Sequence, residues 1–219
     1  MRIVTPAEVL DLINPVVTVG TFDGVHVGHA TVIESVLSHA KNLNGTSVVL
    51  TFDPHPRQYI DGANAPALLT SLPEKCARFE ALGIDVLAIV PFNEILRQQT
   101  PDVFVHRYLF DWLHARHVVV GYDHGFGKDR QGGISTMASL GEQLGFAVTS
   151  VDPSLIDEKP VSSTRIRQAF DAGKFKEAVF LLGGQFPVWG VVRKGDGRGR
   201  SLGFPTANVS FNKSEKLSP

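Results

Sequence analysis

Two histidines stand three residues apart in a glycine-punctuated turn near the N-terminus, at His26 and His29. The turn, residues 20–29 (GTFDGVHVGH), follows an apolar β-branched segment and precedes a stretch with helical spacing. If a helix begins at Val27, both imidazoles point the same way, and Gly28 leaves the space between them free of a side chain. A helix N-terminus offers unpaired N–H groups to a phosphate, and two imidazole donors would strengthen that site. The turn therefore predicts a polyphosphate site.

A metal site is an alternative interpretation of the same residues. Histidines three apart can bind zinc, and Asp23, Asp53 and His55 could complete a metal hydrolase site. Catalytic zinc sites need a third well-placed ligand and an open water position. The chain has no GxxxxGK[ST] segment, which argues against a P-loop.

The whole ten-residue turn resembles the HxGH nucleotidylyltransferase superfamily, and its longer GxFDGxHxGH form resembles bacterial FAD synthetases. The resemblance implies that His26 and His29 are catalytic residues that bind the phosphates of ATP. It also implies a nucleotide-binding turn that includes Gly20, Phe22, Asp23 and Gly24.

Two later loops agree with this resemblance. In residues 50–58 (LTFDPHPRQ), Asp53 and His55 should reach the same face of an extended segment that two prolines stiffen. Residues 121–133 (GYDHGFGKDRQGG) resemble the family's GxDFxFG loop, with Asp123 as a nucleotide ligand. His124 departs from the family's usual aromatic residue. Asp53, His55 and Phe126 are expected to bind flavin or to shape these loops.

A fourth stretch, residues 161–167 (VSSTRIR), matches the family's SSTxIR motif. The resemblance implies that Ser163, Thr164 and the catalytic Arg167 hold the pyrophosphate leaving group, with Arg165 as a further candidate. Read locally, the two serines could simply cap a helix.

The implied reaction joins ATP and FMN to give FAD and pyrophosphate, with Mg²⁺. The FMN phosphate is already an anionic nucleophile, so positioning and charge stabilisation would do most of the catalysis. Mg²⁺ should sit mainly on phosphates and water. Two other functions stay open: a flavin- or nucleotide-binding regulator without turnover, and an HxGH nucleotidyltransferase with another acceptor, such as a pantetheine or nicotinate nucleotide.

The elements that must position these residues alternate along the chain. Apolar runs predict strands at residues 15–22, 47–52, 85–90, 117–120 and 147–151, and helical spacing predicts helices at 29–42, 73–82, 100–114 and 134–144. Thr100 should cap the third helix, with Pro101 at its first position. This is the pattern of an α/β fold with a doubly wound, Rossmann-like parallel sheet, in which ligands bind at the carboxyl ends of strands.

Beyond Val151 the alternation stops. Two helical segments, 164–172 and 175–182, predict a small helical appendage, and Gly183-Gly184 breaks the pattern. We therefore expect an FMN adenylyltransferase domain at residues 1–184 and a separate segment at 185–219.

The last segment contains residues 186–209 (FPVWGVVRKGDGRGRSLGFPTANV), which resemble the start of a riboflavin kinase domain. The resemblance implies that Thr206 and Asn208, which face one side of an extended segment, contribute to the Mg-ATP site of a completed kinase. Gly195, Gly197 and Gly199 would allow close backbone approach. About 35 residues are too few for a closed β-barrel, so we expect an incomplete N-terminal fragment of that domain.

Composition limits the partners. The 219 residues carry 21 basic and 22 acidic side chains, a net charge of −1 that would not attract nucleic acid or an anionic membrane. The only cysteine, Cys76, cannot form an internal disulfide and fits a reducing cytosol. No stretch approaches the roughly 18 apolar residues of a membrane span. We expect a cytoplasmic protein whose partners are the small molecules ATP, FMN and riboflavin.

Overall fold

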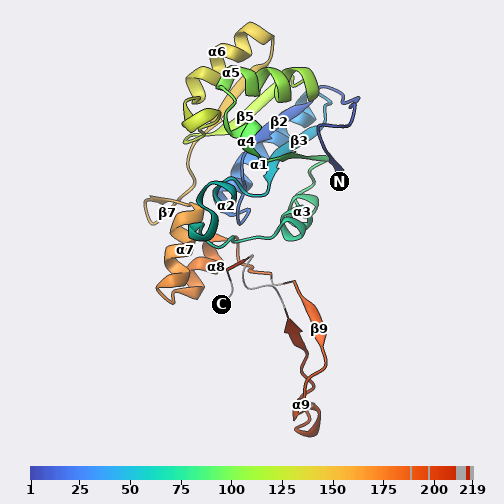
Figure 1. Cartoon of the computed structure of the whole chain (residues 1–219), viewed down its shortest axis with the longest axis vertical. Helices are drawn as coiled ribbons and strands as arrows, with labels where there is room; N and C mark the ends of the chain where they lie inside the picture. The colour runs from blue at the N-terminus through green and yellow to red at the C-terminus, as the bar shows by residue number, and fades with distance from the viewer. Residues whose placement is uncertain (188, 197, 211–215, 218–219) are drawn as a thin grey trace.

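A computed structural model describes residues 1–187, 189–196, 198–210 and 216–217 (Figure 1). Its centre is a six-stranded sheet in the order β1-β4-β3-β2-β5-β6, and every neighbouring pair is parallel. The strands are β1 (Arg2–Val4), β2 (Val16–Val19), β3 (Ser47–Asp53), β4 (Val86–Pro91), β5 (His117–Gly121) and β6 (Ala147–Val151). The predicted parallel sheet is confirmed, and β1 is an addition to it.

The strand order contains one reversal that matters for function. The chain runs from β2 outward to β3 and β4, and then returns to place β5 on the other side of β2. Ligands of open α/β sheets bind at such a switch point, outside the carboxyl ends of the strands. The histidine turn follows β2 and the 121–133 loop follows β5, so both begin at this point.

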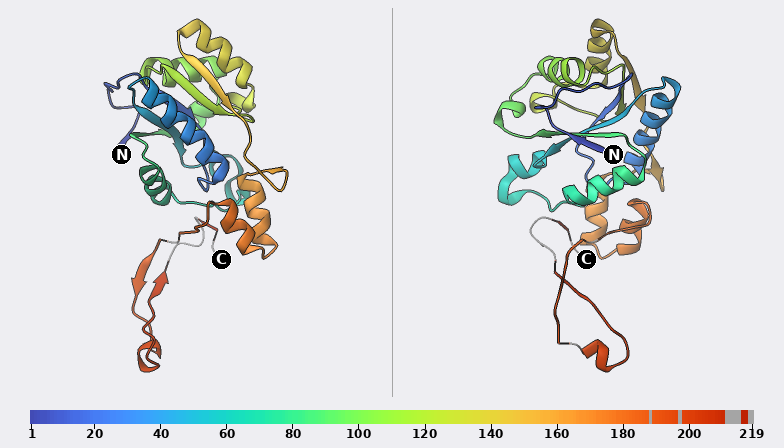
Figure 2. Two further views of the ribbon diagram at one scale, coloured as in Figure 1. Left: turned by 180° about the vertical axis from the view of Figure 1, so that it is seen from behind. Right: turned by 90° about the vertical axis from the view of Figure 1, so that its right-hand side faces the viewer.

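Helices cover both faces of the sheet, and Figure 2 places α1 and η2 on opposite sides of the strands. One face carries α1 (Val27–Asn42) and α3 (Leu72–Ala81), and the other carries α5 (Pro101–Phe104), η2 (Val105–Trp112) and α6 (Ile134–Leu144). The strands alternate accordingly: Val118 and Val120 pack with the second set, whereas Val119 packs with the first.

A small helical unit, α7 (Ser163–Asp171) and α8 (Phe175–Leu181), lies beyond the carboxyl ends of the strands (Figure 1). It has its own apolar cluster, which includes Leu69 from the main domain. The predicted appendage is therefore confirmed. Short elements complete the described chain: α2 (Pro56–Asp61), η1 (Gly62–Asn64), α4 (Glu94–Arg97), η3 (Lys128–Arg130), β7 (Leu155–Ile156), β8 (Lys159–Pro160), β9 (Val191–Arg193), α9 (Arg198–Ser201) and β10 (Asn208–Ser210).

Two local predictions need correction. The helix expected at 100–114 begins as predicted, with Thr100 accepting from the Val103 N–H, but it widens into a π-helix over Val105–Trp112. Apolar spacing does not separate the two helix types, so the sequence pattern could not show this. The stretch with helical spacing, 29–42, also starts too late: α1 begins at Val27, the start that was assumed for the orientation of the two histidines.

Candidate functional site

The two histidines of the turn stack on each other at the start of α1. Their ring centroids are 3.6 Å apart and their planes differ by 15°. His26 is the N-cap residue, and its Nδ1 accepts a hydrogen bond from the His29 N–H at 3.3 Å. A Cβ on Gly28 would stand 3.3 Å from the His26 ring and from the Val161 carbonyl oxygen. Glycine at this position therefore leaves room for the stacked pair.

Both imidazoles are held in the neutral form. Burial lowers the pKa of His26 to about 4. Burial also lowers the pKa of His29 well below its ordinary value, and the nearby His26 and Lys75 add to that effect. Because Nδ1 of a neutral His26 accepts a hydrogen bond, its proton is on Nε2, which is then free to donate. Among the described residues, Nδ1 of His29 is buried without a hydrogen-bond partner.

Asp23 ties the histidine turn to α7. Its carboxylate is 2% exposed, accepts from the backbone N–H groups of Leu69 (2.9 Å) and Thr70 (3.1 Å), and forms an ion pair with Arg167. The Ser163 hydroxyl donates to the Asp23 carbonyl at 2.9 Å. The structure therefore brings the first motif and residues 161–167 together across some 140 positions of sequence.

The rest of the turn is held by protein contacts. The Gly24 N–H donates to the Thr70 hydroxyl at 2.9 Å, and the Gly24 carbonyl accepts from Arg78 at 2.8 Å. Gly24 also adopts φ +91°, a conformation that favours glycine. A Cβ on Gly20 would stand 3.0 Å from the Phe22 ring, which itself lies edge-on to His29 with centroids 5.1 Å apart. These residues shape the turn that presents the histidines.

Residues 53–55 differ from the expected extended segment. His55 is the N-cap of α2, and its Nδ1 accepts from the Arg57 N–H at 3.1 Å. Burial lowers the pKa of His55 to about 4, whereas Asp53 is exposed at the end of β3. The two side chains therefore do not share one environment, because a helix begins directly after His55.

Phe126 anchors the 121–133 loop to the hydrophobic core. Phe126 is 6% exposed and belongs to the core, where its ring lies 6.1 Å from that of Phe104. His124 stacks on Phe126 with centroids 5.6 Å apart. Asp123 is exposed, and its carbonyl accepts from Arg130 at 3.0 Å. The Asp123 carboxylate thus faces solvent beside the switch point.

The polar residues at the start of α7 make different contacts. Ser162 caps the helix by accepting from the Arg165 N–H at 3.2 Å, and Thr164 is exposed in the first turn. The Arg165 guanidinium donates to the carbonyls of Ile156 (2.8 Å) and Lys159 (3.0 Å), so it holds the β7–β8 hairpin.

One buried cation of this region has no signal in the sequence. Lys75 on α3 is 5% exposed, and its Nζ donates to the Thr21 carbonyl, inside the histidine turn, at 2.7 Å. A lysine at an ordinary helical position is usually solvated, so only the tertiary fold reveals this placement.

Comparison with known proteins decides the family. A family model described as FAD synthetase matches residues 10–165, which is most of the chain, and one described as riboflavin kinase matches residues 182–219. This chain belongs to the FAD synthetase family. The resemblance that the motifs indicated is therefore confirmed.

Curated relatives of this FAD synthetase family chain are named bifunctional riboflavin kinase/FMN adenylyltransferase. The protein of Listeria monocytogenes is 39% identical over 202 residues, covering 92% of this chain and 64% of the relative. That of Bacillus subtilis is 38% identical (93% and 64%), and that of Haemophilus influenzae is 36% identical (90% and 64%). The chain thus spans less than two thirds of the length of these relatives.

Two solved structures resemble the fold. A Streptococcus pneumoniae protein named macrolide-efflux protein has a TM-score of 0.83 and 27% identity, covering 96% of this chain and 69% of its own. A Francisella tularensis pantoate-beta-alanine ligase, complexed with beta-gamma ATP and beta-alanine, has a TM-score of 0.51 and 16% identity, with coverages of 81% and 78%. The second likeness concerns the fold alone.

The segment of this family member that matches riboflavin kinase includes an antiparallel β9–β10 hairpin, which extends away from the sheet in Figure 1. Its glycines lie against the predicted kinase residues: a Cβ on Gly199 would be 2.8 Å from the Thr206 hydroxyl, and one on Gly195 would overlap the Asn208 amide. Gly197 lies outside the described residues. Both Thr206 and Asn208 are exposed.

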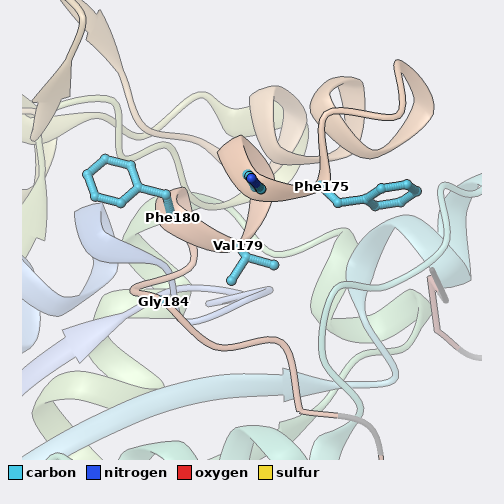
Figure 3. A pocket seen from close by; sticks show the side chains of 5 residues that line it. Phe175, Val179, Phe180 and Gly184 are labelled. Atoms are coloured by element: carbon cyan, nitrogen blue, oxygen red, sulfur yellow. The ribbon is translucent and has the colours of Figure 1, made fainter.

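The described residues include a surface hollow, but neither a metal-binding cluster nor a membrane-spanning helix. An apolar surface hollow on α8 is lined by Phe175, Val179 and Phe180, and the two phenylalanine rings point in opposite directions (Figure 3). It contains none of the motif residues. In the part of the chain that the structure describes, no three His, Cys, Asp or Glu side chains gather as a metal site, and no helix is long and apolar enough to cross a membrane.

Proposed function

We propose that this chain transfers the AMP portion of ATP to FMN, giving FAD and pyrophosphate. The observation that carries the proposal is the pair of neutral, stacked imidazoles at the N-terminus of α1, at the switch point of the sheet, joined through Asp23 to Ser163 and Arg167. Family membership and the names of the relatives support the same reaction.

In the proposed reaction, an oxygen of the FMN phosphate attacks the α-phosphorus of ATP. The bond from that phosphorus to the bridging oxygen of the β-phosphate breaks, and pyrophosphate leaves with the electron pair. The nucleophile is already an anion, so the protein needs no side-chain nucleophile. Its task is to align the two phosphates and to stabilise the charge that develops during transfer.

His26 and His29 supply hydrogen-bond donors for the triphosphate. As neutral imidazoles they add directed N–H groups to the unpaired backbone donors of α1. Phe22 packs against His29, and Gly28 admits the stacked pair, so both rings are positioned before substrate arrives. This preorganisation is the main catalytic contribution that we assign to the turn.

Arg167, Ser163 and Thr164 act on the pyrophosphate side. Arg167 Nε donates to the Ala67 carbonyl at 2.8 Å, and the Asp23 pair fixes the guanidinium while leaving donors unused by the described part of the chain. We assign Asp123 to the nucleotide. Gly20, Phe22, Asp23, Gly24 and Arg165 act by shaping and bracing the site, and Phe126 by anchoring its loop. Asp53 and His55 stand at the end of β3 for contacts with the flavin substrate.

Mg²⁺ would be carried mainly by the substrate phosphates, where it neutralises charge. The exposed Asp53 carboxylate suits a water-mediated contact with such an ion. We further propose a domain boundary at residue 184, a cytoplasmic location, and ATP and FMN as small-molecule partners. In the longer relatives' arrangement, residues 185–219 would begin a kinase domain that makes FMN from riboflavin, with Thr206 and Asn208 at its Mg-ATP site.

The test is to incubate the purified chain with Mg-ATP and either FMN or riboflavin, and to separate the flavins by chromatography. We expect FAD and an equal amount of pyrophosphate from FMN, and no FMN from riboflavin. Binding of both substrates without pyrophosphate release would instead support a regulator. AMP transfer to a pantetheine or nicotinate nucleotide, but not to FMN, would show that the chain is a nucleotidyltransferase with another acceptor.

A further inference from the structure

The ammonium of Lys75 is a buried charge with little compensation. The side chain is 5% exposed, and among the described residues the Thr21 carbonyl is the one hydrogen-bond partner of Nζ, with no carboxylate within 4.0 Å. An ammonium has three donors, so two remain for other partners. Burying an uncompensated charge costs several kcal/mol, which makes such a placement unusual for a purely structural residue.

Neighbouring acids do not balance this charge by contact. The Asp23 carboxylate is paired with Arg167 and accepts from two backbone N–H groups, and Asp53 is exposed at the end of β3. Burial lowers the pKa of Lys75, and the more distant Asp23 and Asp53 only oppose that effect. Because Arg167 is paired with Asp23, Lys75 is the cation of this site that lacks a contacting carboxylate among the described residues, and an incoming anion would supply that contact.

The position of Lys75 matches the reacting groups. Its hydrogen-bond acceptor, Thr21, lies between Gly20 and Phe22 at the carboxyl end of β2. Its charge also lowers the pKa of both His29, in the histidine turn, and His55, in the loop after β3. These are the two segments to which the proposed function assigns ATP and the flavin substrate.

We propose that Lys75 Nζ binds a phosphate group of a substrate, an inference that rests on the proposed adenylyl transfer. The alternative is that Lys75 only braces the turn through the Thr21 carbonyl. A neutral hydrogen-bond donor would do that without the cost of a buried charge. A ligand phosphate gives the cation a partner that the described protein residues do not supply.

The experiment compares Lys75→Met, which keeps an unbranched chain as far as the ε position and removes the ammonium, with Lys75→Arg. Lys41→Met, an exposed site near the end of α1, is the matched control. We expect Lys75→Met to lower kcat/KM for FAD formation by about 10²- to 10³-fold, the usual loss of one preorganised donor. Its Tm should be unchanged or higher, because an apolar residue replaces a buried charge. Lys75→Arg should restore most of the lost activity, and Lys41→Met should match wild type.

Separate KM values for ATP and FMN distinguish which substrate's phosphate is bound. A kcat/KM for Lys75→Met within threefold of wild type would overturn the proposal. So would a fall in activity that Lys75→Arg does not relieve and that parallels a fall in Tm. If wild type makes no FAD, the proposed function fails, and that result is distinct from a failure confined to the variants.

A second measurement uses the wild-type chain, in case Lys75→Met does not fold. The Nζ resonance of Lys75 is assigned by its loss in Lys75→Arg, and its pKa is followed by NMR with saturating pyrophosphate or FMN. A bound phosphate anion favours the ammonium, so we expect one of these ligands to raise the pKa of Lys75. An unchanged pKa with both ligands would contradict the inference whether or not the chain makes FAD.

Discussion

At the residue scale, the candidate site depends on imidazoles that stay neutral. His26 and His29 lose their charge through burial, yet each keeps a ring that can donate or accept a hydrogen bond. A charged pair stacked at 3.6 Å would repel itself, so neutrality is also what permits the stack. The donors are then directed by packing and by the His26 cap of α1 rather than by attraction to a counter-ion.

The first prediction concerns His29. Replacing it by alanine should lower kcat for FAD formation by about 10²- to 10³-fold, equivalent to about 3 to 4 kcal/mol, because one preorganised donor is lost. Steady-state kinetics on a variant with unchanged circular dichroism provides the measurement. His39→Ala, on the same helix but at its far end, should retain normal kcat. Near-normal FAD formation by His29→Ala would remove the role we assign to this residue.

The second prediction concerns pH and stability. Burial, with Arg130 nearby, lowers the pKa of His124 to about 4, from 6.5 for the unfolded chain, and Asp123 only partly opposes this. Between these values His124 binds more protons in the unfolded chain, so its contribution to the free energy of unfolding falls as pH drops from about 6.5 toward 4 and is level above 6.5.

Urea unfolding at several pH values tests this effect with His124→Phe, which keeps an aromatic ring beside Phe126. Within that pH window, the free energy of unfolding of wild type should fall with decreasing pH more steeply than that of the variant. The difference between the two slopes should be up to about 1.4 kcal/mol per pH unit. An identical slope for the two proteins would show that the histidine is protonated equally in the folded and unfolded states.

At the element scale, the site depends on the junction of β2 and α1. Gly28→Ala should improve helix propensity by up to about 1 kcal/mol, yet its Cβ would press on the His26 ring and the Val161 carbonyl at 3.3 Å. We expect Tm to stay within a few degrees of wild type, while kcat/KM falls on the order of tenfold through displacement of the ring. Ser38→Ala, an exposed change on the same helix, should leave both values unaltered. Full activity in Gly28→Ala would mean that the ring position is not critical.

Most elements of the sheet could be predicted because their signals are local. The runs that form β3 and β5 are apolar and β-branched, and α6 and β6 have the predicted limits. Strand β1 was missed, since its three residues form a strand only by pairing with β4. The helix α2 was missed because the prolines around His55 suggested an extended loop.

In the candidate site, too, only the contacts between residues close in sequence could be predicted. The histidine pair is contiguous in sequence, so its geometry follows from one turn and one helix start. The Asp23–Arg167 pair and the Lys75–Thr21 hydrogen bond join residues 144 and 54 positions apart, and no local pattern encodes either contact. Family resemblance placed residues 161–167 at the site, but nothing in the sequence indicated Lys75.

At the scale of the whole molecule, α3 connects the two segments that match different families. Lys75 faces the histidine turn, while the adjacent Glu74 accepts from Lys216, at 2.8 Å to both carboxylate oxygens. Lys216 lies in the stretch that matches riboflavin kinase, and its ammonium is 4.3 Å from the Phe186 ring centroid. A buried ion pair therefore fastens this stretch to the FAD synthetase part.

Breaking the ion pair between Lys216 and Glu74 should destabilise the folded protein. Lys216→Met would leave the Glu74 carboxylate, 2% exposed, without its cation, and we expect a loss of about 3 kcal/mol or more in the free energy of unfolding. Arg97→Met removes a comparable but exposed pair with Glu94 and should cost less than about 1 kcal/mol. Chemical denaturation of both variants gives the comparison. Equal small losses would show that the Lys216 contact contributes little to the fold.

The proposed adenylyl transfer requires that ATP is held by the paired imidazoles at the start of α1, opposite the first turn of α7. The most direct measurement is a crystal structure of the chain with Mg²⁺ and a non-hydrolysable ATP analogue. We predict phosphate oxygens within hydrogen-bond distance of the His26 and His29 rings, with Arg167 or Ser163 on the pyrophosphate side. An analogue bound away from residues 20–29, with those imidazoles contacting no phosphate, would rule out this role of His26 and His29.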